Sequence, residues 1–132
     1  MVNILKNKNV LITGATGGVG RELCSQFIEQ GSNLFITSKD IDKLELLGEE
    51  LECEYIENDF NTGIKVLTSH IRNTIGTIDI LVNCAGIFIS DNLNELTNED
   101  FDKIFNVNVK APFLLMKEFS KDMKKQKWGR II

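Results

Sequence analysis

Residues 9–20 read NVLITGATGGVG, and this stretch decides how the rest of the chain is interpreted. It opens with a short apolar run, Val10, Leu11 and Ile12, of the kind found in buried parallel strands. Several glycines follow, and residues 21–30 then have helical periodicity. A strand, a glycine turn and a helix in this order are typical of a dinucleotide phosphate site. Glycines let the backbone approach the pyrophosphate, and the start of the helix presents free N–H groups.

The glycine spacing is T-G-x-x-x-G-x-G, formed by Thr13, Gly14, Gly18 and Gly20. It is not G-x-G-x-x-G, because position 16 is Thr, and the extra residues lengthen the turn before the helix. A tight turn without a ligand is the alternative interpretation, since glycines often mark turns alone. The strand–turn–helix setting favours the phosphate site.

The composition is that of one soluble globular domain. The chain has 132 residues, 42% hydrophobic and 26% charged, with a net charge of −4, which gives no reason to expect nucleic-acid binding. The cysteines, Cys24, Cys53 and Cys84, are odd in number and far apart, so we expect a reduced, cytoplasmic setting. We see no signal peptide, no apolar run long enough to span a bilayer, and no metal-site spacing.

Strand and helix patterns alternate along the chain. We expect strands at residues 9–13, 34–37, 54–56, 78–82 and 128–132, and helices at 21–30, 41–51, 64–75 and from 97 to about 125. This alternation predicts an α/β fold, a Rossmann-type doubly wound parallel sheet with helices on both faces, which ends here at its fifth strand. Residues 1–132 then form one dinucleotide-binding domain.

The last helix carries further expectations. Thr97 and Asp100 resemble a capping box at its start, and Pro112 should kink or interrupt it. Asn108 falls on its apolar side, where the side-chain amide must find partners. We expect its apolar face to consist of Phe101, Ile104, Phe105, Leu115, Phe119 and Met123.

Several motifs together resemble the short-chain dehydrogenase/reductase family. They are T-G-A-T-G-G-V-G at 13–20, Asp59 after the third strand, L-V-N-C-A-G at 81–86, and Asn108 in F-N-V-N-V. The resemblance covers the whole chain but only the first half of a family member. Within the family, the overall sequence pattern is most similar to that of 3-oxoacyl-(acyl-carrier-protein) reductases. The resemblance implies an NADP(H)-dependent oxidoreductase that reduces a carbonyl to an alcohol in fatty acid synthesis. It also implies a homo-oligomer at full length.

The resemblance implies roles for single residues. Asp59 matches the carboxylate that accepts from the adenine amino group, although it would also be able to cap the following helix. Asn108 matches a residue that helps to hold a water in the proton relay, and the alternative is a core Asn at a helix irregularity. Cys84 replaces the second Asn of N-N-A-G, and we expect it to be a packing residue rather than a reactive thiol. The expected cofactor-binding residues are Thr13, Gly14, Thr16, Gly18, Val19, Gly20, Ser38, Lys39, Asp59, Asn83, Cys84, Ala85 and Gly86.

The end of the second strand selects between NADP and NAD. A carboxylate there would bind the ribose hydroxyls and repel a 2′-phosphate. The residues at this position are Ser38 and Lys39, whose hydroxyl and positive charge favour NADP(H). Asp40 lies one residue further, and NAD(H) is favoured instead if its side chain turns inward.

Family chemistry needs a Ser and a Tyr-x-x-x-Lys motif. The only tyrosine, Tyr55, has Asp59 rather than Lys four residues later, so we expect an N-terminal fragment that is inactive by itself. One alternative is a non-catalytic dinucleotide-binding or regulatory module. A receiver-type signalling domain phosphorylated on Asp59 would need acidic Mg²⁺ ligands where Thr13 and Gly14 stand. A plain structural α/β domain would leave the glycine turn unexplained.

Basic residues gather at the end of the last helix. Such a run is usually a solvated face that complements the helix dipole. In acyl-carrier-protein reductases a basic residue at the position of Lys127 contacts the acidic carrier, which is the second interpretation. We expect the single histidine, His70, on a helix surface. The basic residues are Lys117, Lys121, Lys124, Lys125, Lys127 and Arg130.

Overall fold

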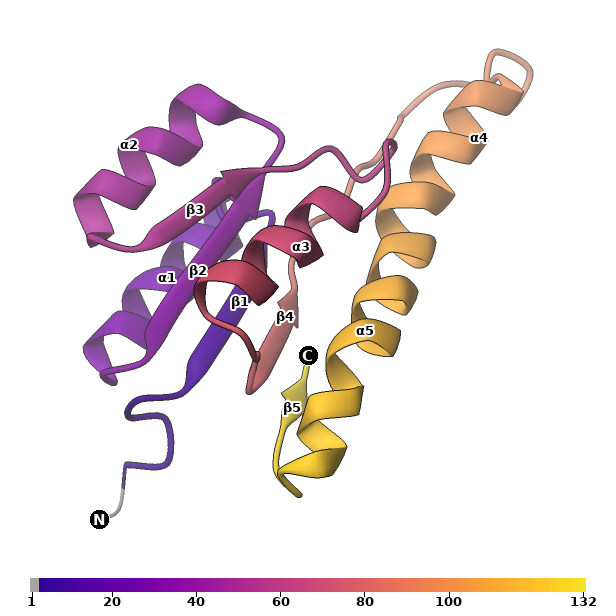
Figure 1. The fold of residues 1–132 in the computed structure, drawn as a ribbon. Helices are drawn as coiled ribbons and strands as arrows, with labels where there is room; N and C mark the ends of the chain where they lie inside the picture. Colours follow the sequence, from indigo (N-terminus) through magenta and orange to yellow (C-terminus); the bar gives the residue numbers. More distant parts are fainter. Residues whose placement is uncertain (1–2) are drawn as a thin grey trace.

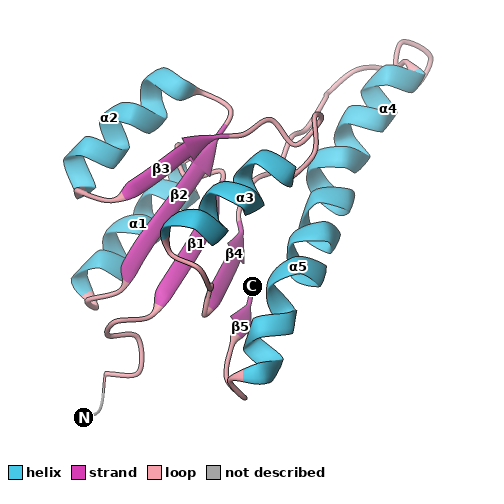
Figure 2. Ribbon diagram, in the orientation of Figure 1, coloured by secondary structure: helices cyan, strands magenta, loops and turns pink. Residues whose placement is uncertain are grey.

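The computed structural model describes residues 3–132, in which strands and helices alternate (Figure 1; Figure 2). The strands are β1 (Asn9–Thr13), β2 (Asn33–Ser38), β3 (Glu54–Glu57), β4 (Ile80–Asn83) and β5 (Arg130–Ile131). The helices are α1 (Gly18–Glu29), α2 (Ile41–Leu51), α3 (Lys65–Thr74), α4 (Asn98–Phe105) and α5 (Ala111–Lys125), with a π-helical turn, η1 (Asn106–Lys110), between the last two. Every expected element is present, with bounds that shift by a few residues.

The strands form one parallel sheet in the order β3-β2-β1-β4-β5. The chain builds outward from β1 to β3 and then crosses back to place β4 on the other side of β1. The strand order therefore reverses between β1 and β4, and the carboxyl ends of these two strands meet at that point. The predicted doubly wound α/β fold is confirmed.

The central strand β1 contributes to two separate cores. Val10 and Ile12 pack with Cys24 beneath α1 and α2, on one face of the sheet. Leu11 points to the other face and packs in the core that includes Phe119, beneath α3 and α5 (Figure 1). All three β1 side chains are fully buried, as expected for a parallel strand covered on both faces.

The segment from α4 to α5 continues as helix, with one interruption (Figure 2). In η1 the Ala111 N–H donates to the Asn106 carbonyl, five residues back. Pro112 then lies in the first turn of α5, where a proline is tolerated. The interruption expected at Pro112 is therefore present, as a π-helical turn just before it. The capping box is confirmed, since Thr97 Oγ1 accepts from the Asp100 N–H at 3.1 Å.

The expected apolar face of this helix is wrong in part. Leu115, Phe119 and Met123 are buried, but Phe101 and Phe105 are 58% and 47% exposed. A π-helical turn contains about one residue more than an α-helical turn, so it rotates α5 against α4 by about a quarter of a turn. The spacing of about 3.6 residues between apolar positions therefore cannot be continued unchanged across η1. The apolar residues of this segment divide into a buried stripe and an exposed stripe.

Arg72 joins α3 to α5 on the surface of one core. Its guanidinium forms ion pairs with Asp122 and with Glu118, at 3.0 Å from the latter, and donates to the Gly76 carbonyl at 2.9 Å. It also lies 5.3 Å from the centre of the Phe119 ring. Hydrogen bonds from Arg72 lower the pKa of the Glu118 carboxyl. Two residues earlier on α3, His70 is half-buried, with its ring 5.7 Å from that of Phe35.

Replacing Arg72 with Met should lower the free energy of unfolding by about 1–2 kcal/mol, because partly buried acceptors lose a charged donor. The lowered pKa of Glu118 means that its share of stability is present above the unfolded pKa and is lost as pH falls through the folded pKa. The difference between variant and parent should therefore shrink between about pH 5 and about pH 3. Urea denaturation across this range measures it.

The matched control is Arg21→Met, which breaks the exposed ion pair with Glu50. That pair joins α1 to α2 at the surface and should contribute much less. Equal losses in the two variants would contradict a special role for Arg72.

Candidate functional site

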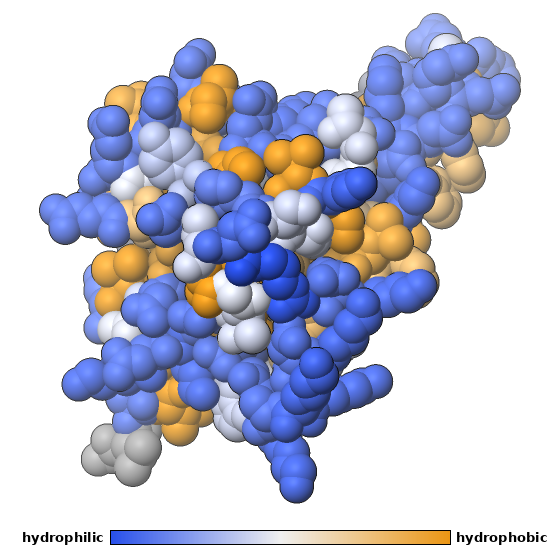
Figure 3. Space-filling view, viewed as in Figure 1, coloured by the Kyte–Doolittle hydropathy of each residue, from blue (hydrophilic) through white to orange (hydrophobic). Residues whose placement is uncertain are grey.

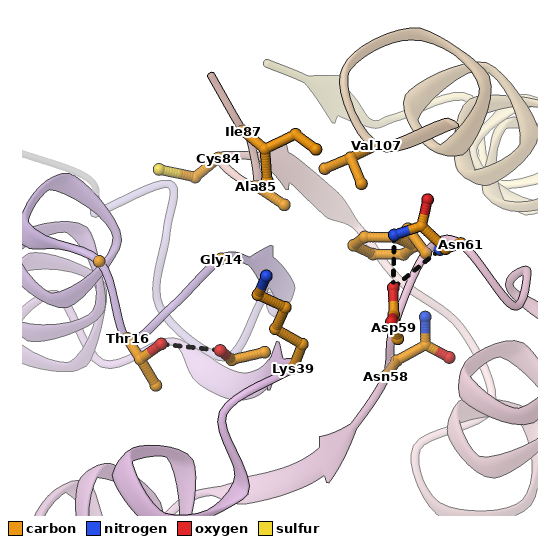
Figure 4. Close-up of a pocket in the computed structure, with 14 residues that line it drawn as sticks. Gly14, Thr16, Lys39, Asn58, Asp59, Asn61, Cys84, Ala85, Ile87 and Val107 are labelled. Atoms are coloured by element: carbon orange, nitrogen blue, oxygen red, sulfur yellow. Dashed lines mark hydrogen bonds between the residues drawn. The ribbon is translucent and has the colours of Figure 1, made fainter. Parts of the chain in front are cut away.

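A cavity of about 250 Å³ opens at the carboxyl ends of β1 to β4 (Figure 4). This is the end of an open α/β sheet at which ligands bind, beside the point where the strand order reverses. Several of the residues expected to bind a cofactor lie in its wall. They are Gly14, Thr16, Ser38, Lys39, Asp59, Cys84, Ala85 and Gly86.

Two glycines are required by close backbone packing. Gly14 has a φ of +63°, and a Cβ there would lie 2.6 Å from the Ala85 Cα. A Cβ on Gly20 would lie 2.3 Å from the Gly14 carbonyl oxygen. By contrast, a Cβ on Gly18 would have no neighbour within 4 Å. Gly14 and Gly20 therefore close the turn against β4 and α1, whereas Gly18 leaves open space at the start of the helix.

The N-terminus of α1 is suited to an anion. Its N-cap residue, Gly17, lines the cavity and offers no side-chain hydrogen bond. The first turn of the helix contains no acidic side chain. The first N–H groups and the positive end of the helix dipole are therefore left to a ligand at this place.

Thr13 and Asn83 hold strands together behind the wall. The buried Thr13 hydroxyl accepts from the Ala85 N–H at 3.0 Å, which fixes the turn after β4 against β1. The Asn83 side-chain amide donates to the Ile132 carbonyl at 3.2 Å. Among the described residues no donor reaches the buried Asn83 Oδ1. Neither side chain lines the cavity, so Thr13 acts by fixing the turn after β4, whereas Asn83 joins the end of β4 to the chain after β5.

One corner of the cavity is formed by hydroxyls and a lysine. The Thr16 and Ser38 hydroxyl oxygens are 2.7 Å apart, which links the glycine turn to the end of β2 (Figure 4). Figure 4 shows the Lys39 side chain extended toward the middle of the cavity. Asp40 does not line it, because its carboxylate caps α2 and accepts from the Lys43 N–H at 3.2 Å. The corner therefore combines neutral donors with a positive charge.

Asp59 lies at the rim beyond β3. Its Oδ1 accepts from the backbone N–H and the side-chain amide of Asn61, at 2.9 and 3.0 Å (Figure 4). Helix α3 begins after Ile64 and has no side-chain cap. The alternative that Asp59 caps this helix is therefore wrong, and its exposed carboxylate is held at the cavity by a local turn.

Asn108 anchors η1 to the loop after β4. Its Oδ1 accepts from the Ile87 N–H and its Nδ2 donates to the Ile87 carbonyl, both at 2.8 Å. The amide oxygen and nitrogen thus each have a partner, although the side chain is exposed and not buried on an apolar face as expected. This pair places Ile87 and Val107 in the cavity wall.

Comparison with known proteins identifies the family to which this sheet and cavity correspond. A family model described as short chain dehydrogenase matches residues 8–132. The chain belongs to the short-chain dehydrogenase family. The receiver-type alternative is therefore wrong.

Individual members of the family agree with this assignment. A 3-oxoacyl-(acyl-carrier-protein) reductase, FabG, of Rickettsia typhi is 37% identical over 125 residues, which are 95% of this chain and 52% of that protein. An uncharacterized oxidoreductase of Thermotoga maritima is also 37% identical, over 96% of this chain and 53% of its own. A short-chain dehydrogenase of known structure from Streptomyces avermitilis superposes with a TM-score of 0.86 at 25% identity, over 96% of this chain and 48% of that one. The chain spans about half the length of each of these three proteins.

Some wall residues of this family member were not expected from the sequence. Asn58 is buried and follows β3 directly, so the rule that ligands bind at strand ends would have found it. Ile87 and Val107 carry no such local signal, since tertiary contacts bring them to the wall. The remaining unexpected members of the wall are Gly17, Phe60 and Asn61. Expected residues outside it are Thr13, Gly18, Val19, Gly20, Asn83 and Asn108.

The described residues, 3–132, contain no evident metal site. No three His, Cys, Asp or Glu side chains among them lie so that they would hold a metal ion. No helix in this part of the chain has the length and apolarity needed to cross a bilayer.

Two of the three cysteines are not reactive thiolates. Burial raises the pKa of the Cys24 thiol to about 12 and that of the Cys53 thiol to about 11, so both stay protonated at neutral pH.

The glycine geometry predicts unequal costs for two similar substitutions. Gly20→Ala should lower the free energy of unfolding by about 1–3 kcal/mol, because its methyl group meets the Gly14 carbonyl. Gly18→Ala should not destabilise the fold, since the added methyl group enters open space. Thermal or urea unfolding of both variants measures the difference. Equal stability of the two variants would contradict the close contact between position 20 and the Gly14 carbonyl.

Proposed function

We propose that this protein binds NADP(H) and works as a reductase that converts a carbonyl to an alcohol. The observation that carries this proposal is the cavity at the strand-order reversal, where the uncapped start of α1 faces the corner formed by Thr16, Ser38 and Lys39. Backbone N–H groups would hold the pyrophosphate there. Bound NADPH would supply the hydride.

We assign the two ends of the adenosine moiety to different side chains. The exposed Asp59 carboxylate at the rim would accept from the adenine amino group. Ser38 and Lys39 would receive the 2′-phosphate of NADP(H), because they offer a hydroxyl and a positive charge. The Asp40 carboxylate, which would favour NAD(H), is directed into the cap of α2 instead.

Catalysis by the family needs groups that these 132 residues do not contain. The Ser and the Tyr-x-x-x-Lys motif are absent from the sequence, so we propose that this stretch by itself binds cofactor without turnover. Asn108 would support the proton relay from η1, where its side chain already holds Ile87. A non-catalytic dinucleotide-binding module would share the binding behaviour but not regain activity when a catalytic half is supplied.

We propose a 3-oxoacyl group on acyl carrier protein as the substrate. The name of the Rickettsia typhi relative supports this assignment. The carrier is acidic, and the C-terminal end of α5 offers Lys124, Lys127 and Arg130 around a shared depression. We also propose the cytoplasm as the location, in keeping with free cysteines at 24, 53 and 84.

We further propose that the full-length protein is a homo-oligomer that pairs through the α4–α5 helix. An exposed apolar stripe runs along this helix and consists of Phe101, Phe105, Val109, Phe113 and Met116. Figure 3 shows hydrophobic side chains at the surface in the region of this helix. A stripe of this kind is a surface that proteins usually cover.

Lys39→Ala should weaken NADPH binding about fivefold and leave NADH binding nearly unchanged, because only NADPH carries the 2′-phosphate that Lys39 would pair with. Fluorescence titration of both reduced dinucleotides measures this. Lys65→Ala, which removes an exposed lysine at the start of α3, is the control. Failure of the parent protein to bind either dinucleotide would contradict the proposed function.

Lys127→Glu should weaken binding of acyl carrier protein to a chain that includes the catalytic half, because the reversed charge repels the acidic carrier. The effect should fade in high salt. Surface plasmon resonance at low and high salt measures it, with Lys65→Glu as the charge-matched control. Unchanged affinity of the Lys127 variant would remove this lysine from the docking surface.

A further inference from the structure

Asp40, the residue that follows Lys39, carries a negative charge beside a corner proposed to receive a phosphate. Asp40 stands next to the corner that would receive a 2′-phosphate, and a carboxylate in such a corner repels phosphate and binds the free ribose hydroxyls instead. Yet both oxygens of Asp40 are engaged elsewhere. Oδ1 accepts from the Lys43 N–H at 3.2 Å, and Oδ2 lies 2.9 Å from Lys43 Nζ.

The backbone of Asp40 meanwhile supports the corner that its side chain leaves. Its N–H donates to Ser38 Oγ at 3.3 Å, and Ser38 in turn shares a hydrogen bond of 2.7 Å with Thr16. Ser38 is only 8% exposed, so its hydroxyl is fixed by these two neighbours. One residue thus holds the hydroxyl pair from its backbone while its carboxylate points along α2.

We propose that Lys43 is a positioning residue for cofactor choice: its ion pair holds the Asp40 carboxylate in the α2 cap, and this leaves the ribose corner to Ser38 and Lys39. The inference rests on the proposed dinucleotide-binding function. It adds that the preference for NADP(H) depends on a residue outside the cavity wall, one turn into the next helix. Hydrogen bonds from Lys43 also lower the pKa of the Asp40 carboxyl, so this carboxyl stays ionised at neutral pH.

Two features make this pair suited to a selective role. Lys43 is within direct reach of Asp40, because residues three apart on a helix face each other. The pair is also partly exposed, with 71% of the Lys43 and 38% of the Asp40 side chain accessible. Such a pair contributes little to overall stability, so its loss would free Oδ2 to turn toward the corner without unfolding the domain, while Oδ1 is held by the Lys43 N–H alone.

The test compares dissociation constants for NADP⁺ and NAD⁺, measured by calorimetry on the same preparations. Lys43→Met should lower the preference for NADP⁺ by about two- to fivefold, the range expected for loss of one exposed ion pair. Adding Asp40→Ser to that variant should restore the preference, because serine caps the helix without a charge. A double variant that stays as low as Lys43→Met would mean that Lys43 contacts the phosphate directly, and would overturn the proposal.

The matched control is Lys103→Met. Lys103 pairs with Asp100 with the same spacing of three residues, but this pair lies at the start of α4 and not beside Ser38 and Lys39 in the sequence. Its loss should leave the NADP⁺ to NAD⁺ preference unchanged. The single variant Asp40→Ser should raise the preference by less than about twofold, since a paired exposed carboxylate exerts a weak field. A tenfold rise would show that Asp40 already faces the ribose.

The outcomes separate this inference from the function on which it rests. If the parent binds neither dinucleotide, the proposed function fails. If the parent binds both and Lys43→Met leaves their ratio unchanged, the function stands and the positioning role of Lys43 is wrong. Circular dichroism of each variant checks that the fold is retained.

Discussion

The close approach of two backbone turns governs this structure. The turn after β1 lies so near the turn after β4 that a Cβ on Gly14 would meet Ala85, and the Thr13 hydroxyl bonds the same residue from behind. Parallel strands alone would bring the two turns to one edge of the sheet. Only a glycine with a positive φ lets them touch, and that contact places the open start of α1 at the mouth of the cavity.

Local hydrogen bonds decide which charges reach that cavity. Asp40 and Asp59 both follow strand ends that border it, and both would be able to place a carboxylate in it. Asp40 is drawn into a helix cap, whereas Asp59 is held at the rim by an Asx turn with Asn61. A short polar side chain forms hydrogen bonds with whichever backbone N–H groups lie close to it, so two aspartates at similar places in the fold have different roles.

Much of this arrangement could be read from the sequence because it depends on local rules. The apolar run at 10–12 and the glycines that follow predicted both the first strand and the turn, and the strand-end rule brought Ser38, Lys39 and Asp59 to one cavity. The contributions of Ile87 and Val107 could not be read, because they depend on a contact between residues 21 positions apart. The exposed stripe was missed because a helical period was extended through a π-helical turn.

That turn links the packing of the last helix to the cavity. Asn108 must face Ile87, and Phe119 must face the core. A regular α-helix that continued from α4 would satisfy only one of these two orientations, because they differ by the rotation of one residue about the helix axis. The extra residue in η1 satisfies both, and Val107 reaches the wall from the same turn. π-Helical turns are found at functional sites for such reasons, since they are retained where a side chain must be aimed at some cost to helix geometry. Pro112 favours this geometry, because it has no N–H with which to continue the α-helical pattern at the end of the turn.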